Sequence, residues 1–234
     1  MFHPETVPPT PRYRAPRAFA VLVAVSAVIV LAGLLTPWWA LPHEVLAYLD
    51  VSNEVSLPTW WNTSLLVVAG ALMFVVAAGS PEPRERAAWR LIGGIVLLMS
   101  LDEASMLHER LALVGLHWWP EAGLNYMWLA LGVPLAVTVA LVVVLVGRFL
   151  PGRTRWAVLG AFGLYFAGAV GAEVAQELAL RADWHWFVRH FLTHLEEGLE
   201  MTGAALLLVA PLALLHHPHV VRSPATTEAP NRSG

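Results

Sequence analysis

The chain has 234 residues, of which 57% are hydrophobic and only 13% are charged, and its formal net charge at pH 7 is −3. This balance, with a mean hydropathy of +0.61, lies outside that of a water-soluble domain and indicates an all-α, polytopic membrane protein. The absence of cysteine excludes disulfides, thiolate zinc sites and cysteine nucleophiles, and the negative net charge gives no support for nucleic-acid binding.

Six apolar segments approach the roughly 20 residues that a helix needs to cross a hydrocarbon core of about 30 Å. They lie near residues 18–38, 61–79, 88–109, 126–148, 155–178 and 190–215. The first follows arginines, as a signal peptide would, but it ends in TPWWALP without a small-residue cleavage site, and we interpret it as a retained anchor. We expect a six-helix transmembrane domain over 17–217, with disordered cytoplasmic tails at 1–16 and 218–234.

The arginines predict which side of the membrane each loop faces. One side is flanked by Arg12, Arg14, Arg17, Arg84, Arg86, Arg90, Arg148, Arg153, Arg155 and Arg222, and the other only by Arg110, Arg181 and Arg189. Because positive loops stay in the cytoplasm, we expect both termini to be cytoplasmic and the protein to lie in the plasma (inner) membrane. Tryptophans at 38–39, 60–61, 118–119, 184 and 186 fall on the outer side and resemble an aromatic belt.

Three of the six spans carry ionisable side chains in their outer third. SLDEASMLHER (100–110) continues the third span, GAEVAQELAL (171–180) ends the fifth, and HFLTHLEEGLE (190–200) begins the sixth. Ionisable groups inside a membrane usually face the interior of a bundle or a wet cavity rather than lipid. We therefore expect spans three, five and six to form a polar core that spans one, two and four screen from lipid.

Helical spacing brings histidines and carboxylates onto shared faces, because residues three, four or seven apart lie on one side of a helix. His190, His194 and Glu197 form an HxxxH pair followed by a carboxylate, and Asp102 aligns with Glu109 on the third span. Imidazole and carboxylate groups are ligands that zinc, iron and manganese accept. The ligands predicted for a divalent metal are His190, His194, Glu197, His108, Asp102 and Glu109.

Arginines can neutralise only part of the acidic charge in these regions. Eight acids, Asp102, Glu103, Glu109, Glu173, Glu177, Glu196, Glu197 and Glu200, stand against three arginines, which leaves five negative charges. A partly buried carboxylate avoids its desolvation cost by protonation, hydrogen bonding or binding a cation. The residues leave three interpretations open: a bound metal, which the paired histidines favour, a proton or cation pathway, and an ionic cluster without a ligand.

A metal in this position would support chemistry on a substrate dissolved in the lipid bilayer. One metal would activate water to hydrolyse a lipid-borne ester, amide or phosphoester, with Glu173, Glu177 or Glu196 as the general base. Two bridged metals would suit an oxidase, although the Glu-x-x-His order of di-iron bundles is absent. The alternatives are a small proton- or cation-coupled transporter and a non-catalytic membrane partner subunit.

The HxxxH pair of His190 and His194, with His108 and Ser105 on an earlier span, is similar to the pattern of the alkaline ceramidase and adiponectin-receptor superfamily of seven-helix zinc hydrolases. That resemblance would imply a zinc ion held by the three histidines. The chain departs from the pattern in its six expected spans, in the two residues rather than three between Ser105 and His108, and in the absence of an acid in the fourth span.

Overall fold

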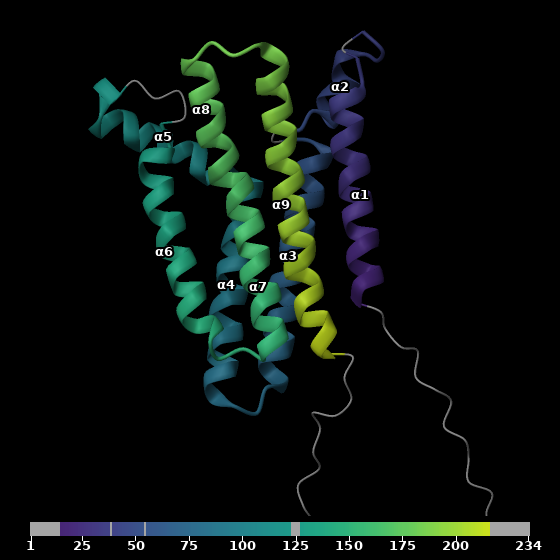
Figure 1. Cartoon of the computed structure of the whole chain (residues 1–234), viewed down its shortest axis with the longest axis vertical. Helices are drawn as coiled ribbons and strands as arrows, with labels where there is room; N and C mark the ends of the chain where they lie inside the picture. The colour runs from purple at the N-terminus through teal and green to yellow at the C-terminus, as the bar shows by residue number, and fades with distance from the viewer. Residues whose placement is uncertain (1–14, 38, 54, 123–126, 216–234) are drawn as a thin grey trace, which may run out of the picture.

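The computed structural model describes residues 15–37, 39–53, 55–122 and 127–215, and this part of the chain is all-α (Figure 1). The elements are α1 (Ala15–Leu35), α2 (His43–Leu49), α3 (Leu57–Gly79), α4 (Pro83–Ser105), α5 (Leu107–Trp118), η1 (Pro120–Ala122), α6 (Leu129–Gly147), α7 (Gly152–Phe166), η2 (Ala167–Ala172), α8 (Glu173–Arg181) and α9 (Trp186–Leu215). Here η1 is a single 3₁₀ turn and η2 is a π-helical segment. The tails predicted at 1–16 and 218–234 lie almost wholly outside the described residues.

Five helical segments are long and apolar enough to cross a membrane, and the bent pair α4–α5 is a sixth candidate. Four of the five are α1, α3, α6 and α9, and the fifth is the continuous 30-residue segment from Gly152 to Arg181. Successive spans run in opposite directions along the bundle (Figure 1). These features confirm the expected multi-pass helical bundle.

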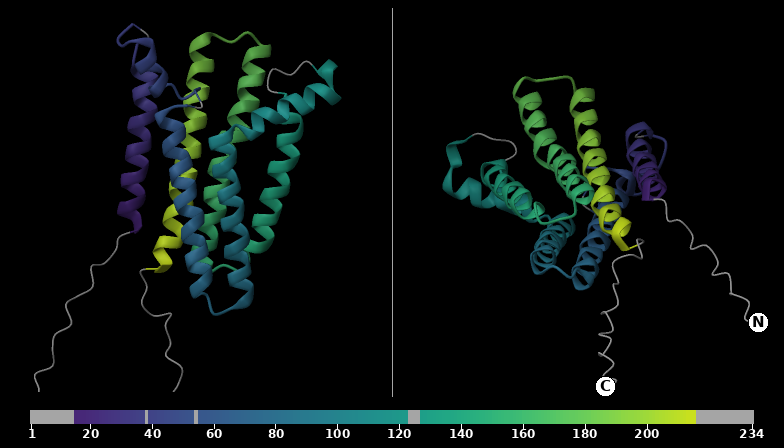
Figure 2. Two further views of the ribbon diagram at one scale, coloured as in Figure 1. Left: turned by 180° about the vertical axis from the view of Figure 1, so that it is seen from behind. Right: turned by 60° about the horizontal axis from the view of Figure 1, so that its bottom comes forward.

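We call the end of the bundle that carries α2, α5 and the α8–α9 connection the upper end, as it stands in Figure 1, and the opposite end the lower end. The first residue of α1 and the last residue of α9 both lie at the lower end, with the α3–α4 and α6–α7 connections (Figures 1 and 2). The arginines predicted to be cytoplasmic that fall within the described residues lie in or beside these lower segments. The side of the membrane that the lower end faces stays a prediction.

Apolar side chains from α3, α4, α7 and α9 pack the lower half of the bundle. Trp89 and Ile92 of α4, Leu66 and Met73 of α3, and Leu207 of α9 are all fully buried. The expectation that the second span only screens the core is wrong, because 44% of the apolar window of α3 is buried against 6% for α1. Helix α3 is therefore part of the core.

Two interruptions of helix geometry lie in the upper half. Helix α4 ends at Ser105, Met106 adopts the left-handed conformation with φ 53° and ψ 43°, and α5 leaves at a bend of 77°. A single helix over 88–109 is therefore a wrong prediction. The Oδ1 of Asp102 accepts a hydrogen bond from the His108 amide at 2.8 Å, which satisfies a backbone donor that the start of α5 would otherwise leave open. The second interruption is η2, between α7 and α8.

Candidate functional site

Carboxylates from α4, α8 and α9 meet inside the upper half of the bundle. Glu200 is only 6% exposed, and the charged groups that act on it are Glu103, Glu196 and Glu197. Glu196 in turn interacts with Glu173 and Glu103. We call Glu103, Glu173, Glu196, Glu197 and Glu200 the carboxylate layer. The sequence analysis expected acids of the third, fifth and sixth spans at one depth, and the charges of these five residues act on one another inside the bundle.

Neutral side chains provide the hydrogen bonds to Glu200. The Nδ2 of Asn62, on α3, donates a hydrogen bond to Glu200 Oε2 at 3.3 Å. The Tyr165 hydroxyl forms a hydrogen bond with Glu200 and lies 3.5 Å from Glu103 Oε2. Asn62 is completely buried, and its Oδ1 has no hydrogen-bond partner among the described residues. The deepest carboxylate of the layer therefore has neutral donors beside it and like charges around it.

The close approach of α9 to span five depends on glycine in η2. A Cβ on Gly168 would lie 2.7 Å from the backbone oxygen of Glu196 and 2.8 Å from Cγ of Glu200. Both distances are shorter than any ordinary carbon contact, and the first involves backbone that cannot move aside alone. Any larger residue at 168 would push the carboxylates of α9 away from the π-helical segment.

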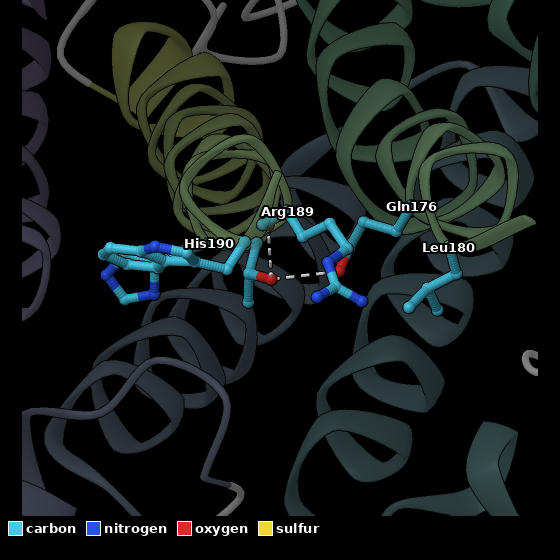
Figure 3. Close-up of a pocket in the computed structure, with 6 residues that line it drawn as sticks. Gln176, Leu180, Arg189 and His190 are labelled. Carbon is cyan, nitrogen blue, oxygen red and sulfur yellow. Dashed lines mark hydrogen bonds between the residues drawn. The ribbon is translucent and has the colours of Figure 1, made fainter. Parts of the chain in front are cut away.

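A short chain of hydrogen bonds connects the carboxylate layer with the upper end. Gln176 of α8, which is 5% exposed, donates through Nε2 to Glu196 Oε2 and accepts through Oε1 from the Thr193 hydroxyl at 2.9 Å. Gln176 and Thr193 also line a cavity of about 290 Å³ between α8 and α9 (Figure 3). The amide of Gln176 therefore lies between this cavity and Glu196.

The two histidines of the HxxxH pair lie on the side of α9 that faces α1. Their ring centroids are 4.3 Å apart, and Nδ1 of His194 donates to the backbone oxygen of His190 at 2.8 Å. The Nε2 of buried His194 approaches Gly33 of α1, lies 3.2 Å from where a Cβ on Gly33 would stand, and has no hydrogen-bond partner within the described ranges. The pair is thus turned toward α1, whereas Glu196 bonds to α8.

The residues predicted on the third span are divided by the bend at Met106. Nδ1 of His108 lies 3.2 Å from Asp102 Oδ2, and the His108 ring meets the ring of Trp128 edge to face. Glu109 is exposed on α5. The predicted alignment of Asp102 with Glu109 is wrong, because it requires an uninterrupted helix through Met106.

The three glutamates predicted as catalytic have different surroundings. Glu196 and Glu173 belong to the carboxylate layer, and His108 is a cationic group that can act on Glu196 when it is protonated. Glu177 is 6% exposed and forms an ion pair with Nε of Arg181 one turn later. Local pairing therefore satisfies Glu177, and a catalytic role for any of the three stays a prediction.

Within the part of the chain that the structure describes, no three His, Asp or Glu side chains gather in a group that could hold a metal ion. The predicted ligands lie in separate places: His190 and His194 toward α1, Glu197 in the carboxylate layer, Asp102 and His108 at the bend, and Glu109 on the exposed surface of α5. These six residues therefore do not form one site, and binding of zinc, iron or manganese stays a prediction.

Asn62, Tyr165, Gln176 and Thr193 are the polar residues that sequence reasoning missed. Each is a neutral side chain inside an apolar span or beside an acid. The one available signal was Asn62, because an amide in the apolar run TWWNTSLLVV has no reason to face lipid.

Residues 18–215 match a family described as Domain of unknown function (DUF8692). No curated protein and no solved structure matches the chain. The matched segment includes the whole carboxylate layer and the cavity between α8 and α9.

Proposed function

The chain belongs to the family Domain of unknown function (DUF8692), and we propose that this multi-pass membrane protein binds a proton at its carboxylate layer. The observation that carries the proposal is the environment of Glu200, a buried carboxylate whose charged neighbours among the described residues are carboxylates and whose hydrogen-bond donors are neutral. The site takes up its proton from the upper end of the bundle.

Desolvation and repulsion act together on Glu200. A buried carboxylate is costly unless it is paired, and neighbouring carboxylates cannot all stay ionised in a water-poor interior. A proton shared within the layer removes both costs. The acceptor Oδ1 of Asn62, which lacks a donor among the described residues, supports the same conclusion independently, because a protonated carboxyl would satisfy it.

The two ends of the bundle differ in access to this site. From the upper end, Thr193 and Gln176 connect the cavity to Glu196 through hydrogen bonds. Toward the lower end, fully buried apolar residues such as Leu66, Met73 and Trp89 fill the space between the helices. This asymmetry supports exchange with one side of the membrane, and the distribution of arginines favours the outer side.

Infrared difference spectroscopy of detergent-purified protein, recorded between alkaline and acidic buffers, tests the proposal. We expect a carbonyl band from a buried protonated carboxyl group that is lost in Glu200→Gln and kept in Glu44→Gln, which changes an exposed acid on α2. Identical spectra for wild type and Glu200→Gln would overturn the proposal.

A second candidate is the metal-dependent hydrolase or oxidase suggested by the HxxxH pair. His194 supports it, because its buried Nε2 has no hydrogen-bond partner in the described ranges and the ring of His190 lies beside it. The test is metal analysis of purified wild type and of the His190→Ala, His194→Ala double variant. We expect bound zinc, iron or manganese to be lost from the variant, and equal metal content in the two proteins rejects this candidate.

A further inference from the structure

The cavity between the upper ends of α8 and α9 has a polar and an apolar side. Its volume is about 290 Å³, and it is lined by Gln176, Leu180, Trp186, Arg189, His190 and Thr193 (Figure 3). Gln176 and Thr193 are already engaged with each other, whereas Leu180 and Trp186 present hydrocarbon and an aromatic ring. Such a lining fits a ligand that has a polar group joined to an apolar part.

Arg189 is the permanent charge in this cavity. Its side chain lies between α9 and α8 in Figure 3, and no described residue forms an ion pair or a side-chain hydrogen bond with its guanidinium. Arg181, at the neighbouring end of α8, differs because it is paired with Glu177. The guanidinium of Arg189 is therefore available to an anion from outside the chain.

The kind of anion follows from the geometry of guanidinium and the position of the cavity. A guanidinium donates two parallel hydrogen bonds to phosphate oxygens, which makes arginine a preferred partner of phosphate groups. His190 also lines the cavity, but its ring points away from Arg189 (Figure 3). Trp186, 62% exposed at the start of a membrane-spanning helix, is the type of residue that lies at the level of lipid headgroups.

We propose that this cavity binds the phosphate group of an anionic membrane lipid, with Arg189 on the phosphate and the first part of the lipid's hydrocarbon against Leu180 and Trp186. The proposal goes beyond the proton site and does not depend on it. The two sites share Gln176, so a phosphate in the cavity would lie one side chain away from Glu196.

Isothermal titration calorimetry of the full chain in a non-ionic detergent tests the proposal with three probes. They are dioctanoyl phosphatidic acid, dioctanoyl phosphatidylcholine and inorganic phosphate. We expect phosphatidic acid to bind most tightly, because it has both an unsubstituted anionic phosphate and the hydrocarbon. In phosphatidylcholine the phosphate carries one charge and is capped by a cationic choline, and inorganic phosphate has no hydrocarbon, so each should bind at least about tenfold more weakly, since one charged hydrogen bond or a few buried methylenes is worth that factor.

Three variants assign the binding to the cavity. Arg189→Gln should weaken the binding of phosphatidic acid about tenfold or more, and Arg189→Lys should keep part of it, because the charge stays while the paired hydrogen bonds are lost. Arg110→Gln, which removes an exposed arginine of α5 at the same end of the bundle, should bind like wild type. Retained binding in Arg189→Lys and Arg110→Gln shows that a loss in Arg189→Gln is not caused by misfolding.

Three results would overturn the proposal. Unchanged affinity in Arg189→Gln would place the anion elsewhere. Inorganic phosphate binding as tightly as phosphatidic acid would assign the cavity to a free anion, and phosphatidylcholine binding as tightly as phosphatidic acid would mean that the cavity does not select an anionic lipid.

Discussion

The lower and upper halves of the bundle are built on different principles. The lower half consists of uninterrupted helices whose apolar side chains, Trp89 and Ile92 among them, are fully buried. The upper half contains the left-handed residue Met106, the π-helical segment η2 and the buried carboxylate Glu200. Irregular backbone and buried ionisable side chains thus occur in the same half of the bundle. π-Helical segments in other proteins are frequently found at functional sites. The lower half thus provides most of the buried apolar packing, and the upper half contains the buried polar side chains.

The largest effect is expected from a cavity in the lower half. Trp89→Ala would remove a fully buried indole that packs in the α3–α4 core and should lower the free energy of unfolding by about 2–4 kcal/mol, mainly through lost packing contacts. Denaturation in mixed micelles measures the change. Trp89→Phe, which keeps most of the volume, should cost much less. Equal, small decreases in the free energy of unfolding in both variants would mean that packing in the lower half contributes little to stability.

An intermediate effect is expected where α9 touches α7, between the two halves. A Cβ on Gly203 would stand 2.8 Å from the Ala161 oxygen and the Tyr165 nitrogen, both backbone atoms, so Gly203→Ala should cost about 1–3 kcal/mol. Gly160→Ala is the matched control, because a Cβ there meets nothing within 4 Å. The same denaturation assay compares them, and a Gly203→Ala protein as stable as Gly160→Ala would contradict the close approach of the helices.

The smallest effect is expected at the bend. Met106 has a positive φ, a conformation that is less favourable for residues with a side chain than for glycine. Met106→Gly should therefore raise the free energy of unfolding by about 0.5–1 kcal/mol. Ala104→Gly, two residues earlier in regular helix, should lower it by about the same amount. Thermal unfolding measures both changes. A loss of stability in both variants would contradict the left-handed conformation of residue 106 and would indicate a straight helix.

Hydropathy predicted the spans well because a membrane imposes one strong requirement on each of them. Twenty apolar residues must form a helix to satisfy their backbone groups, whatever surrounds them. The break after Ser105 carries no such signal, because Met106 is neither glycine nor proline and the acid that satisfies the new helix start lies four residues upstream, at Asp102.

The candidate site was predicted only in part, because spacing along one helix does not say which neighbour each face meets. His190, His194 and Glu196 are close in sequence, yet the histidines lie toward α1 and Glu196 bonds to Gln176 of α8. Charge alone indicated the carboxylate layer. Its neutral partners, such as Asn62 and Tyr165, required knowledge of which helices pack together.

The π-helical segment η2 also sets the rotational phase of everything above it. Each residue of a regular helix turns the chain by about 100°, and a wider turn accommodates an additional residue without lengthening the helix in proportion. If residues 167–172 formed a regular α-helix instead, the hydropathy of span five would be unchanged, but Gln176 and Glu177 would lie about a quarter of a turn further around the axis of α8. The contacts between α8 and α9 therefore depend on the rotation of α8 that η2 produces. Hydropathy alone does not reveal this rotation.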